Sequence, residues 1–431
     1  MLRPINVLVV DDSALMRRII ARLLGMQAGI KVIDTAVSGE EAIKKVHALH
    51  PDVVTMDVEM PGLNGVQTVS RLMKECPVPV VMLSAHTTEG ARVTMEALAA
   101  GAVEFVPKPQ KTGGTEQMVA ELARKIRVAR RASVKKCFAA PVEPRSTQAR
   151  FRKTGPASAK DTSAHGSTPA STSADGQTGS ADVSTAATTR SASKITGKPA
   201  VNIPSKAARS NSAAAYPTPP IASRPTAVRT TAGFKKISAG QTELVVIGSS
   251  TGGPAALQML LPALPGDLPC GVVIVQHIPV GFSGPMAEHL NRKCKLEVKH
   301  AEQGDRVMPG LVLVAPAGYD LTFRKYAGRL TVALDKGNKP VPPGGFRPSV
   351  DVVMNSAADV VGGRTLGVLL TGMGRDGARG MLSIRQRGGR TIAQDESTSV
   401  VYGMPKAAAD LGAAEKILPL HGIAEEIVRL V

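Results

Sequence analysis

The chain has 431 residues, and this length exceeds what a single hydrophobic core usually supports, so we expect two domains. Aromatic residues make up only 3% of the chain and Trp is absent, which argues against recognition through stacked aromatic platforms. The formal net charge of +18 does not indicate a specific nucleic-acid partner, because residues 133–240 alone hold sixteen Lys and Arg against four Asp and Glu.

The cysteines and the apolar runs indicate the compartment. Cys76, Cys137, Cys270 and Cys294 are widely separated and have no histidine at zinc-ligand spacing, which favours reduced thiols. Two carboxylates interrupt the N-terminal apolar run well short of a signal peptide, and no later segment reaches the roughly 18 apolar residues of a spanning helix. We therefore predict a cytoplasmic protein.

In residues 1–130, short β-branched runs alternate with longer amphipathic stretches. This pattern predicts βα units around a buried parallel sheet, and five consecutive units predict a flavodoxin-like (βα)5 domain. The expected strands are 5–10, 31–35, 53–56, 80–83 and 103–106, and the expected helices are 13–25, 40–47, 65–74, 89–100 and 115–130.

Residues 131–240 are dominated by Ala, Ser, Thr, Pro and Gly. Such a segment buries too little apolar surface to offset the entropy of ordering, so we predict a disordered basic linker. The alternation of strands and helices resumes in residues 241–431, which predicts a second α/β domain with a mostly parallel sheet. Its expected strands are 244–247, 271–276, 311–314 and 366–370.

Five polar residues follow strand ends in the first domain. Asp11 and Asp12 follow the first strand and Asp57 the third, so their carboxylates should meet at one sheet edge, where Mg²⁺ is the usual neutralising cation. Asp57 would then be a nucleophile toward a phosphoryl donor, with Ser84 and Lys108 placed to hold phosphate oxygens. Taken singly, the aspartates also fit a simpler interpretation as helix caps or turn residues.

These residues lie in motifs that resemble the response-regulator receiver family over about residues 5–122. The resemblance implies that Asp57 accepts phosphate from a histidine kinase. It also implies that Asp12, Asp57 and the backbone carbonyl of Glu59 hold Mg²⁺, and that Ser84 and Lys108 sense the phosphoryl group. The motifs are Val-Val-Asp-Asp-Ser at 9–13, Met-Asp-Val-Glu-Met-Pro at 56–61, Leu-Ser-Ala at 83–85 and Val-Pro-Lys-Pro at 106–109.

The second domain opens with a strand that runs into a glycine-rich turn. Gly248-x-Ser250-x-Gly252 fits a nucleophile elbow, which projects a hydroxyl from the strand end. Backbone N–H groups at the start of the following helix, that of Thr251 among them, would stabilise a developing oxyanion. A phosphate cradle or a plain helix cap would look much the same, so the pattern alone leaves these alternatives open.

A nucleophilic hydroxyl needs a base and an orienting acid. His277 comes directly after the strand 271–276, at the same predicted sheet edge, although a lone histidine at a strand end is more often structural. Asp376 follows strand 366–370 and is the best-placed acid. Asp351 is the second choice, and we favour a helix cap for it. The order Ser, His, Asp differs from that of the α/β-hydrolases and indicates a convergent triad.

The second domain resembles the chemotaxis protein-glutamate methylesterase family, CheB, over about residues 243–425. The resemblance implies that Ser250 is the nucleophile, His277 the general base and Asp376 its orienting acid, with the backbone amide of Met373 at the oxyanion site and no cofactor. The motifs are Ile-Gly-Ser-Ser-Thr-Gly-Gly at 247–253, Gln-His-Ile-Pro at 276–279, Arg-Pro-Ser-Val-Asp at 347–351, Leu-Thr-Gly-Met-Gly-Arg-Asp-Gly at 370–377 and Tyr-Gly-Met-Pro at 402–405.

This resemblance implies hydrolysis of glutamate methyl esters on chemoreceptors, with release of methanol, and deamidation of receptor glutamines. A chemotaxis histidine kinase would be the phosphodonor, and the membrane would be met only through receptors. We expect phosphorylated Asp57 to uncover the triad. The tether looks longer than is usual in the family, which should weaken contact between the domains. The alternative is a phosphorylation-dependent adaptor whose basic linker touches receptors, membrane or nucleic acid.

Overall fold

The computed structural model describes residues 3–109, 114–132, 242–337 and 345–431. The predicted disordered linker therefore lies outside the described residues, apart from residues 131 and 132.

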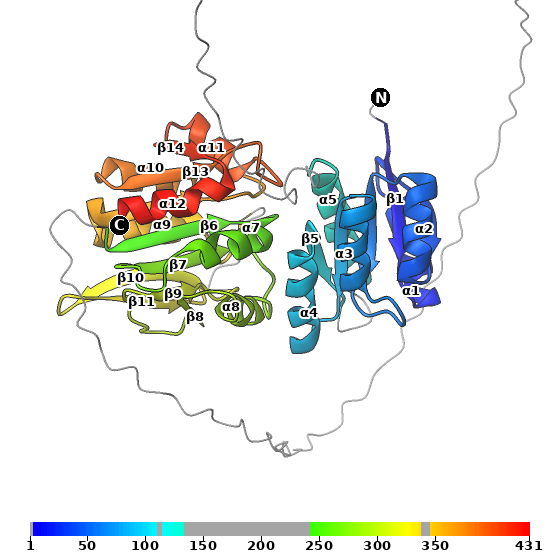
Figure 1. The fold of residues 1–431 in the computed structure, drawn as a ribbon, viewed down its shortest axis with the longest axis horizontal. Coiled ribbons are helices and arrows are strands. Elements are labelled where there is room, and N and C mark those ends of the chain that lie inside the picture. The colour runs from blue at the N-terminus through cyan, green and yellow to red at the C-terminus, as the bar shows by residue number, and fades with distance from the viewer. Residues whose placement is uncertain (1–2, 110–113, 133–241, 338–344) are drawn as a thin grey trace, which may run out of the picture. The chain divides into compact units, whose positions relative to one another are not determined.

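The N-terminal domain contains a parallel sheet of five strands in the order β2-β1-β3-β4-β5. The prediction of a (βα)5 domain is confirmed, with helices packed on both faces of the sheet (Figure 1). Leu8 and Val10 of β1 belong to the core formed with α2, α3 and α4, whereas Val7 and Val9 pack with α1 and α5 on the other face. The elements are β1 (Ile5–Val10), α1 (Ala14–Gly25), β2 (Ile30–Ala36), α2 (Gly39–Leu49), β3 (Val53–Asp57), α3 (Gly65–Glu75), β4 (Val80–Ser84), α4 (Thr88–Ala99), β5 (Glu104–Pro107) and α5 (Thr115–Ala129).

Polar caps fix where the helices of this domain begin. Ser13 accepts a hydrogen bond from the amide of Met16, and Asn64 forms a reciprocal capping box with Gln67 at the start of α3. Such caps satisfy amides that lack a partner within the helix and contribute about 1 kcal/mol each. They also leave the preceding strand ends free to present side chains at the carboxyl edge of the sheet.

The C-terminal domain contains a seven-stranded sheet in the order β14-β13-β12-β6-β7-β9-β8, with every pair parallel. The prediction of a mostly parallel sheet is confirmed. The elements are β6 (Leu244–Ser249), α7 (Gly253–Leu260), η1 (Leu261–Ala263), β7 (Gly271–Gln276), α8 (Ser283–Asn291), β8 (Glu297–His300), β9 (Leu311–Val314), β10 (Asp320–Tyr326), β11 (Arg329–Asp335), α9 (Val350–Val360), η2 (Gly362–Arg364), β12 (Thr365–Leu369), α10 (Ala378–Gln386), β13 (Arg390–Gln394), α11 (Met404–Asp410), β14 (Lys416–Leu418) and α12 (Leu420–Leu430).

The antiparallel hairpin of β10 and β11 was not predicted from the sequence. Buried and more exposed side chains alternate along both strands, and Phe323 and Val332 are paired on the buried face. Ala327 and Gly328 make its turn at positive φ values of 48° and 74°, and an alanine in that conformation gives little signal in a sequence.

Strand β6 occupies the middle of the sheet, and all six of its residues are buried. Val245 and Ile247 belong to the core that includes α7 and α12, while Leu244 and Val246 pack with α9 and α10. Burying each such aliphatic side chain stabilises the fold by about 1.5–3 kcal/mol. The sheet grows from β6 in both directions, through β7 on one side and β12 on the other, and ligands of open α/β sheets collect at such a switch point.

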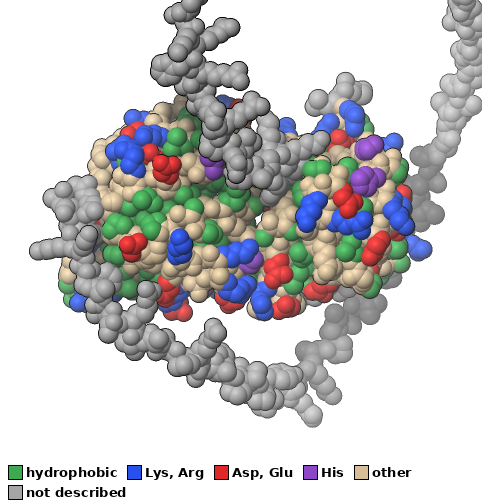
Figure 2. All heavy atoms as spheres, in the orientation of Figure 1, with side chains coloured by type: hydrophobic (Ala, Val, Ile, Leu, Met, Phe, Trp, Pro, Cys, Tyr) green, Lys and Arg blue, Asp and Glu red, His purple; other side chains and the backbone are tan. Residues whose placement is uncertain are grey.

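Charged side chains are spread over the surface of the described domains. On the face shown in Figure 2, Lys and Arg side chains are interspersed with Asp and Glu over the described domains, without a broad area of one sign. None of the described helices is long and apolar enough to cross a membrane.

Candidate functional site

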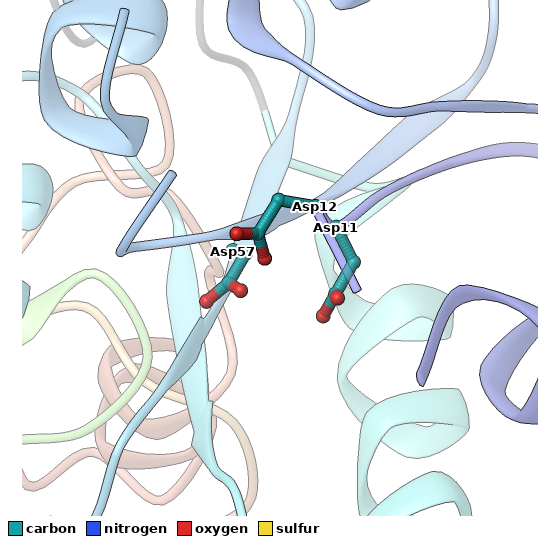
Figure 3. A group of neighbouring side chains, drawn as sticks. All are labelled: Asp11, Asp12 and Asp57. Atoms are coloured by element: carbon teal, nitrogen blue, oxygen red, sulfur yellow. The ribbon is translucent and has the colours of Figure 1, made fainter. Parts of the chain in front are cut away.

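The N-terminal domain brings three carboxylates together at the carboxyl edge of its sheet. Asp11 and Asp12 directly follow β1, and Asp57 is the last residue of β3 (Figure 3). One carboxylate oxygen of each aspartate lies within 4.8 Å of the corresponding oxygens of the other two. Asp11 and Asp57 are buried, and Asp12 is exposed. Clustered carboxylate oxygens are the donors that Mg²⁺ prefers, so the group fits this ion.

Lys108 contributes the positive charge of this pocket. Its Nζ lies 2.6 Å from Oδ2 of Asp57 and 3.0 Å from Oδ2 of Asp11. Burial raises the pKa of Asp57 to about 6, and the ammonium of Lys108 opposes that rise. Burial alone would lower the pKa of Lys108, but the carboxylates of Asp57 and Asp11 raise it above its ordinary value. Lys108 therefore remains a cation beside the predicted phosphoacceptor.

Two predicted members of this pocket have other contacts. The hydroxyl of Ser84 donates to the carbonyl of Gly90 at 3.0 Å and accepts from Thr94 at 2.6 Å, so it is engaged with α4. The amide of Glu59 is hydrogen-bonded to the carboxylate of Asp57. The phosphate-sensing role of Ser84 and the metal contact of the Glu59 carbonyl stay predictions.

In the C-terminal domain, Ser250 lies in a tight turn between β6 and α7. Its amide donates to the carbonyl of Thr371 at 3.0 Å. Gly252 has φ of 76°, and a Cβ there would lie 2.6 Å from Cβ of Val400, so both backbone conformation and space require glycine. The strand, sharp turn and helix are the context that a nucleophile elbow needs.

The register of the sheet places His277 beside this turn. Ser249 pairs with Gln276 across β6 and β7, and the amide of His277 donates to the carbonyl of Ser249 at 3.0 Å. Ser250 and His277 therefore follow directly after paired residues at one edge. Within the described residues, however, no hydrogen bond joins the Ser250 hydroxyl to the imidazole.

Asp376 is the acid that meets the imidazole. Its Oδ2 lies 2.8 Å from Nε2 of His277 and accepts the amide of Val350 at 2.7 Å, while Oδ1 accepts the Ser349 hydroxyl at 2.9 Å and the Asp351 amide at 3.0 Å. Burial would raise the pKa of Asp376, but these contacts, that of His277 foremost, hold it below its ordinary value. The carboxylate thus stays ionised on the first amides of α9.

Asp351, the second choice for the acid, faces elsewhere. Its Oδ1 accepts the amides of Gly377 at 2.9 Å and Gly380 at 2.8 Å, and so anchors the start of α10. Burial raises the pKa of this carboxyl. Asp351 does not cap the helix in whose first turn it lies, because Ser349 is the N-cap of α9; its carboxylate instead accepts amides at the start of the helix that follows Asp376.

The imidazole itself has one engaged and one unengaged nitrogen. Nε2 faces Asp376, whereas Nδ1 is buried without a hydrogen-bond partner among the described residues. The ring stacks on Phe346 with a centroid distance of 3.9 Å and an interplanar angle of 9°. Because the carboxylate is ionised, the proton belongs on Nε2, and Nδ1 is left as the basic nitrogen.

Two predicted oxyanion donors also lie near the turn. A Cβ on Gly372 would lie 2.8 Å from Cβ of Ser250, so the segment carrying Met373 passes close to the predicted nucleophile. Neither the amide of Thr251 nor that of Met373 donates to an acceptor within the part of the chain that the structure describes. Both amides are therefore available, although their role stays a prediction.

Beside Asp376 lies a cavity of about 900 Å³ that the sequence did not predict. Phe346 forms part of its wall, and the exposed side chains of Arg375 and Arg379 stand along it. Lys406 at its far side pairs with Asp410, but none of the described carboxylates forms an ion pair with either arginine.

Comparison with known proteins fits this geometry. Residues 7–120 match the family model described as a response regulator receiver domain, and residues 245–427 match the one described as CheB methylesterase. The protein-glutamate methylesterase/protein-glutamine glutaminase of Moorella thermoacetica is 42% identical over 433 residues, which cover 99% of this chain and 98% of that one. The chain belongs to the CheB methylesterase family.

One further relative and one solved structure are also similar to the chain. Protein-glutamate methylesterase/protein-glutamine glutaminase 1 of Carboxydothermus hydrogenoformans is 40% identical, with 97% of each chain covered. The crystal structure of the Thermotoga maritima CheB methylesterase catalytic domain shares 41% identity, covers 44% of this chain and all of that one, and has a TM-score of 0.43. The order of receiver and CheB domains predicted from the motifs is confirmed.

Proposed function

We propose that Ser250, His277 and Asp376 form the catalytic triad with which this CheB-family chain hydrolyses glutamate methyl esters on chemoreceptors and deamidates receptor glutamines. As a member of the family, the chain is a protein-glutamate methylesterase/protein-glutamine glutaminase that acts in chemotaxis under the control of a receiver domain. The observation that carries the proposal is the 2.8 Å contact between His277 and Asp376, beside the turn that presents Ser250.

Each triad residue has a definite role in the proposed reaction. Nδ1 of His277 takes the proton of the Ser250 hydroxyl as the oxygen attacks the carbonyl carbon, while Asp376 stabilises the imidazolium through Nε2–H. The amides of Thr251 and Met373 receive the oxyanion. The imidazolium then protonates the departing methoxide, methanol leaves, and water attacks the acyl-enzyme by the same route. A glutamine amide follows these steps with ammonia as the leaving group, so no cofactor is needed.

The receiver supplies the proposed control. A chemotaxis histidine kinase is the phosphodonor, and Asp57 attacks its phosphoryl group. Mg²⁺ held by Asp12, Asp57 and the Glu59 carbonyl would neutralise charge on the phosphoryl oxygens, while Lys108 contacts the product. Phosphorylation then frees the triad for the receptor helix.

The remaining assignments follow from the family. We place the protein in the cytoplasm, where it meets the membrane only through receptors and binds no specific nucleic acid. The domain limits 1–130, 131–240 and 241–431 stay predictions; the matched regions, residues 7–120 and 245–427, lie inside the outer two.

The test is mass spectrometry of methylated receptors after incubation with the protein and with Ser250→Ala, each with and without acetyl phosphate. Loss of methyl mass should require the hydroxyl of Ser250 and should accelerate with the phosphodonor. Equal loss with Ser250→Ala would refute the triad, and equal rates with and without acetyl phosphate would refute the control by Asp57. Deleting residues 133–240 tests the adaptor alternative, which predicts lost localisation, whereas turnover of a free substrate persists in an esterase.

A further inference from the structure

One buried carboxamide joins the two strand ends that carry the predicted nucleophile and base. Gln276 is the last residue of β7 and is 2% exposed. Its Nε2 donates to the carbonyl of Ser250 at 2.9 Å and to the carbonyl of His277 at 2.9 Å. Its Oε1 accepts the hydroxyl of Ser249 at 2.6 Å. Both N–H donors and the oxygen are therefore engaged.

The partners also fix which way the amide points. Carbonyl oxygens only accept hydrogen bonds, so the NH₂ group of Gln276 has to face Ser250 and His277. The reversed orientation would set Oε1 against two carbonyl oxygens at close range, so that Oε1 would lose its donor and both carbonyl oxygens would lose the hydrogen bond from this amide. A buried polar group without a partner costs about 1–3 kcal/mol, so the observed orientation is strongly favoured.

Fixing the carbonyl of Ser250 also fixes the next amide along the chain. A peptide unit is planar and trans, so its C=O and N–H point in opposite directions. The Ser250 carbonyl is held by Gln276 and by the amide of Gly253 at 2.7 Å. The N–H of Thr251 consequently points away from Gln276, free for an oxyanion.

The start of α7 is packed directly against this carboxamide. A Cβ on Gly253 would lie 2.1 Å from Oε1 of Gln276, so no larger residue fits there without displacing the side chain. On the other side of the turn, the hydroxyl of Thr371 donates to the carbonyl of Thr251 at 3.0 Å. Gln276 and Thr371 thus hold the turn from its two sides. Of these two side chains, only Gln276 also forms a hydrogen bond with the backbone of His277, the predicted base.

We propose that Gln276 is a positioning residue for the hydrolase reaction: it aims the Thr251 amide at the oxyanion and fixes the distance between the Ser250 and His277 backbones. The role is realised in the transition state, because the charge on the oxyanion develops only there. The inference rests on the proposed triad, and its effect is distinct from that of removing a triad member.

The experiment compares full-length Gln276→Met, Gln276→Glu and Gln276→Asn with the unaltered protein on a methylated receptor fragment. Met retains the volume without hydrogen bonds, and Glu replaces both donors by acceptors. Loss of an oxyanion donor costs about 10²–10³ in kcat, so we expect kcat to fall about a hundredfold with KM nearly unchanged. Affinity for a trifluoromethyl ketone analogue of the substrate should fall by the same factor as kcat/KM.

Two controls separate positioning from general stability. Gln386→Met, at an exposed site at the end of α10, should leave kcat, KM and Tm unchanged. Thr391→Val removes another buried polar group of the same sheet, a hydroxyl of β13 that donates to the carbonyl of Ala413 at 2.7 Å, and should lower Tm with a much smaller fall in kcat. Circular dichroism confirms that each variant is folded.

The proposal is overturned if folded Gln276→Met keeps kcat within about threefold of the parent, if its ketone affinity is unchanged, or if Thr391→Val loses as much kcat. If none of the three Gln276 variants folds, the residue serves core stability and the proposal also fails. The proposed triad is tested separately: full activity of Ser250→Ala would refute it, independently of the results for the Gln276 variants.

Discussion

Nε2 of His277, rather than Nδ1, contacts Oδ2 of Asp376, at 2.8 Å. In the chymotrypsin arrangement the acid holds Nδ1 and the base is Nε2, so the two ring nitrogens exchange roles here. Either nitrogen serves equally well as a base once the other carries the proton. The imidazole comes directly after β7 and the acid after β12, and in this arrangement Nε2 is the ring nitrogen that faces the acid.

Asp376→Asn should remove most of the activity. An amide at this position no longer holds the proton on Nε2 or stabilises the imidazolium, and the equivalent change in a chymotrypsin-type triad lowers kcat about 10⁴-fold. We expect a fall of about 10³–10⁴ in kcat on methylated receptor, measured as methanol release. Asp351→Asn is the matched control: it should lower Tm by weakening the start of α10 but keep kcat within about tenfold, given its distinct hydrogen bonds. The opposite ranking of the two variants would move the acid to Asp351.

The contribution of Asp376 to stability should depend on pH. Its pKa in the folded protein lies below the ordinary value, so the unfolded chain binds the proton more tightly. The stabilisation is therefore fully present above the ordinary aspartate pKa of about 4 and is lost as the pH falls through the lower folded value. The difference in Tm between the parent and Asp376→Asn should shrink on acidification from pH 7 to pH 3. A difference that stays constant would show that the carboxylate is not stabilised by its contacts.

Removal of Mg²⁺ should alter the stability of the receiver. On the proposed assignment, the ion binds the folded acidic pocket and not the unfolded chain, so an ion concentration of 100 times its Kd should stabilise the domain by about 2.7 kcal/mol. Chelation should lower the denaturant midpoint of the receiver transition in the parent, with a much smaller change in Asp12→Ala. A midpoint that responds equally in both proteins would place the ion elsewhere.

Arg375 and Arg379 should help to select the receptor. They line the cavity beside Asp376 without a described carboxylate partner, so they are free to attract acidic side chains near the reacting ester. Arg375→Glu with Arg379→Glu should raise KM for an acidic receptor fragment about tenfold or more at low salt and much less at high salt, because screening removes the effect. The turnover of a small neutral ester should stay unchanged. Equal losses on both substrates would indicate damage to the site itself.

The sequence was most informative where a chemically reactive side chain stands at the end of a strand that the apolar pattern predicts. Strand ends followed by Asp57, Ser250, His277 and Asp376 could be found because parallel strands present their carboxyl ends at one edge. The positioning contacts of Gln276 could not, because a glutamine at a strand end has no signal apart from the register that pairs it with Ser249.

Two other elements were hidden for related reasons. Phe346 lies far from β7 in the sequence, and only the folded chain brings its ring onto the imidazole of His277. The hairpin of β10 and β11 turns through Ala327, a residue that sequence rules do not expect at positive φ. In both cases tertiary packing outweighs local preference.

The strand order has a consequence for synthesis of the protein. Val246 in β6 is the register partner of Gly367 in β12, and more than a hundred residues separate the two in the chain. A nascent polypeptide that has emerged only through β11 therefore has the serine and the histidine but lacks a neighbour on one flank of its central strand. Non-local pairing of this kind forms slowly. A partly made chain on the ribosome should accordingly be unable to demethylate receptors, and the hydrolase should become competent only after its last third has been translated.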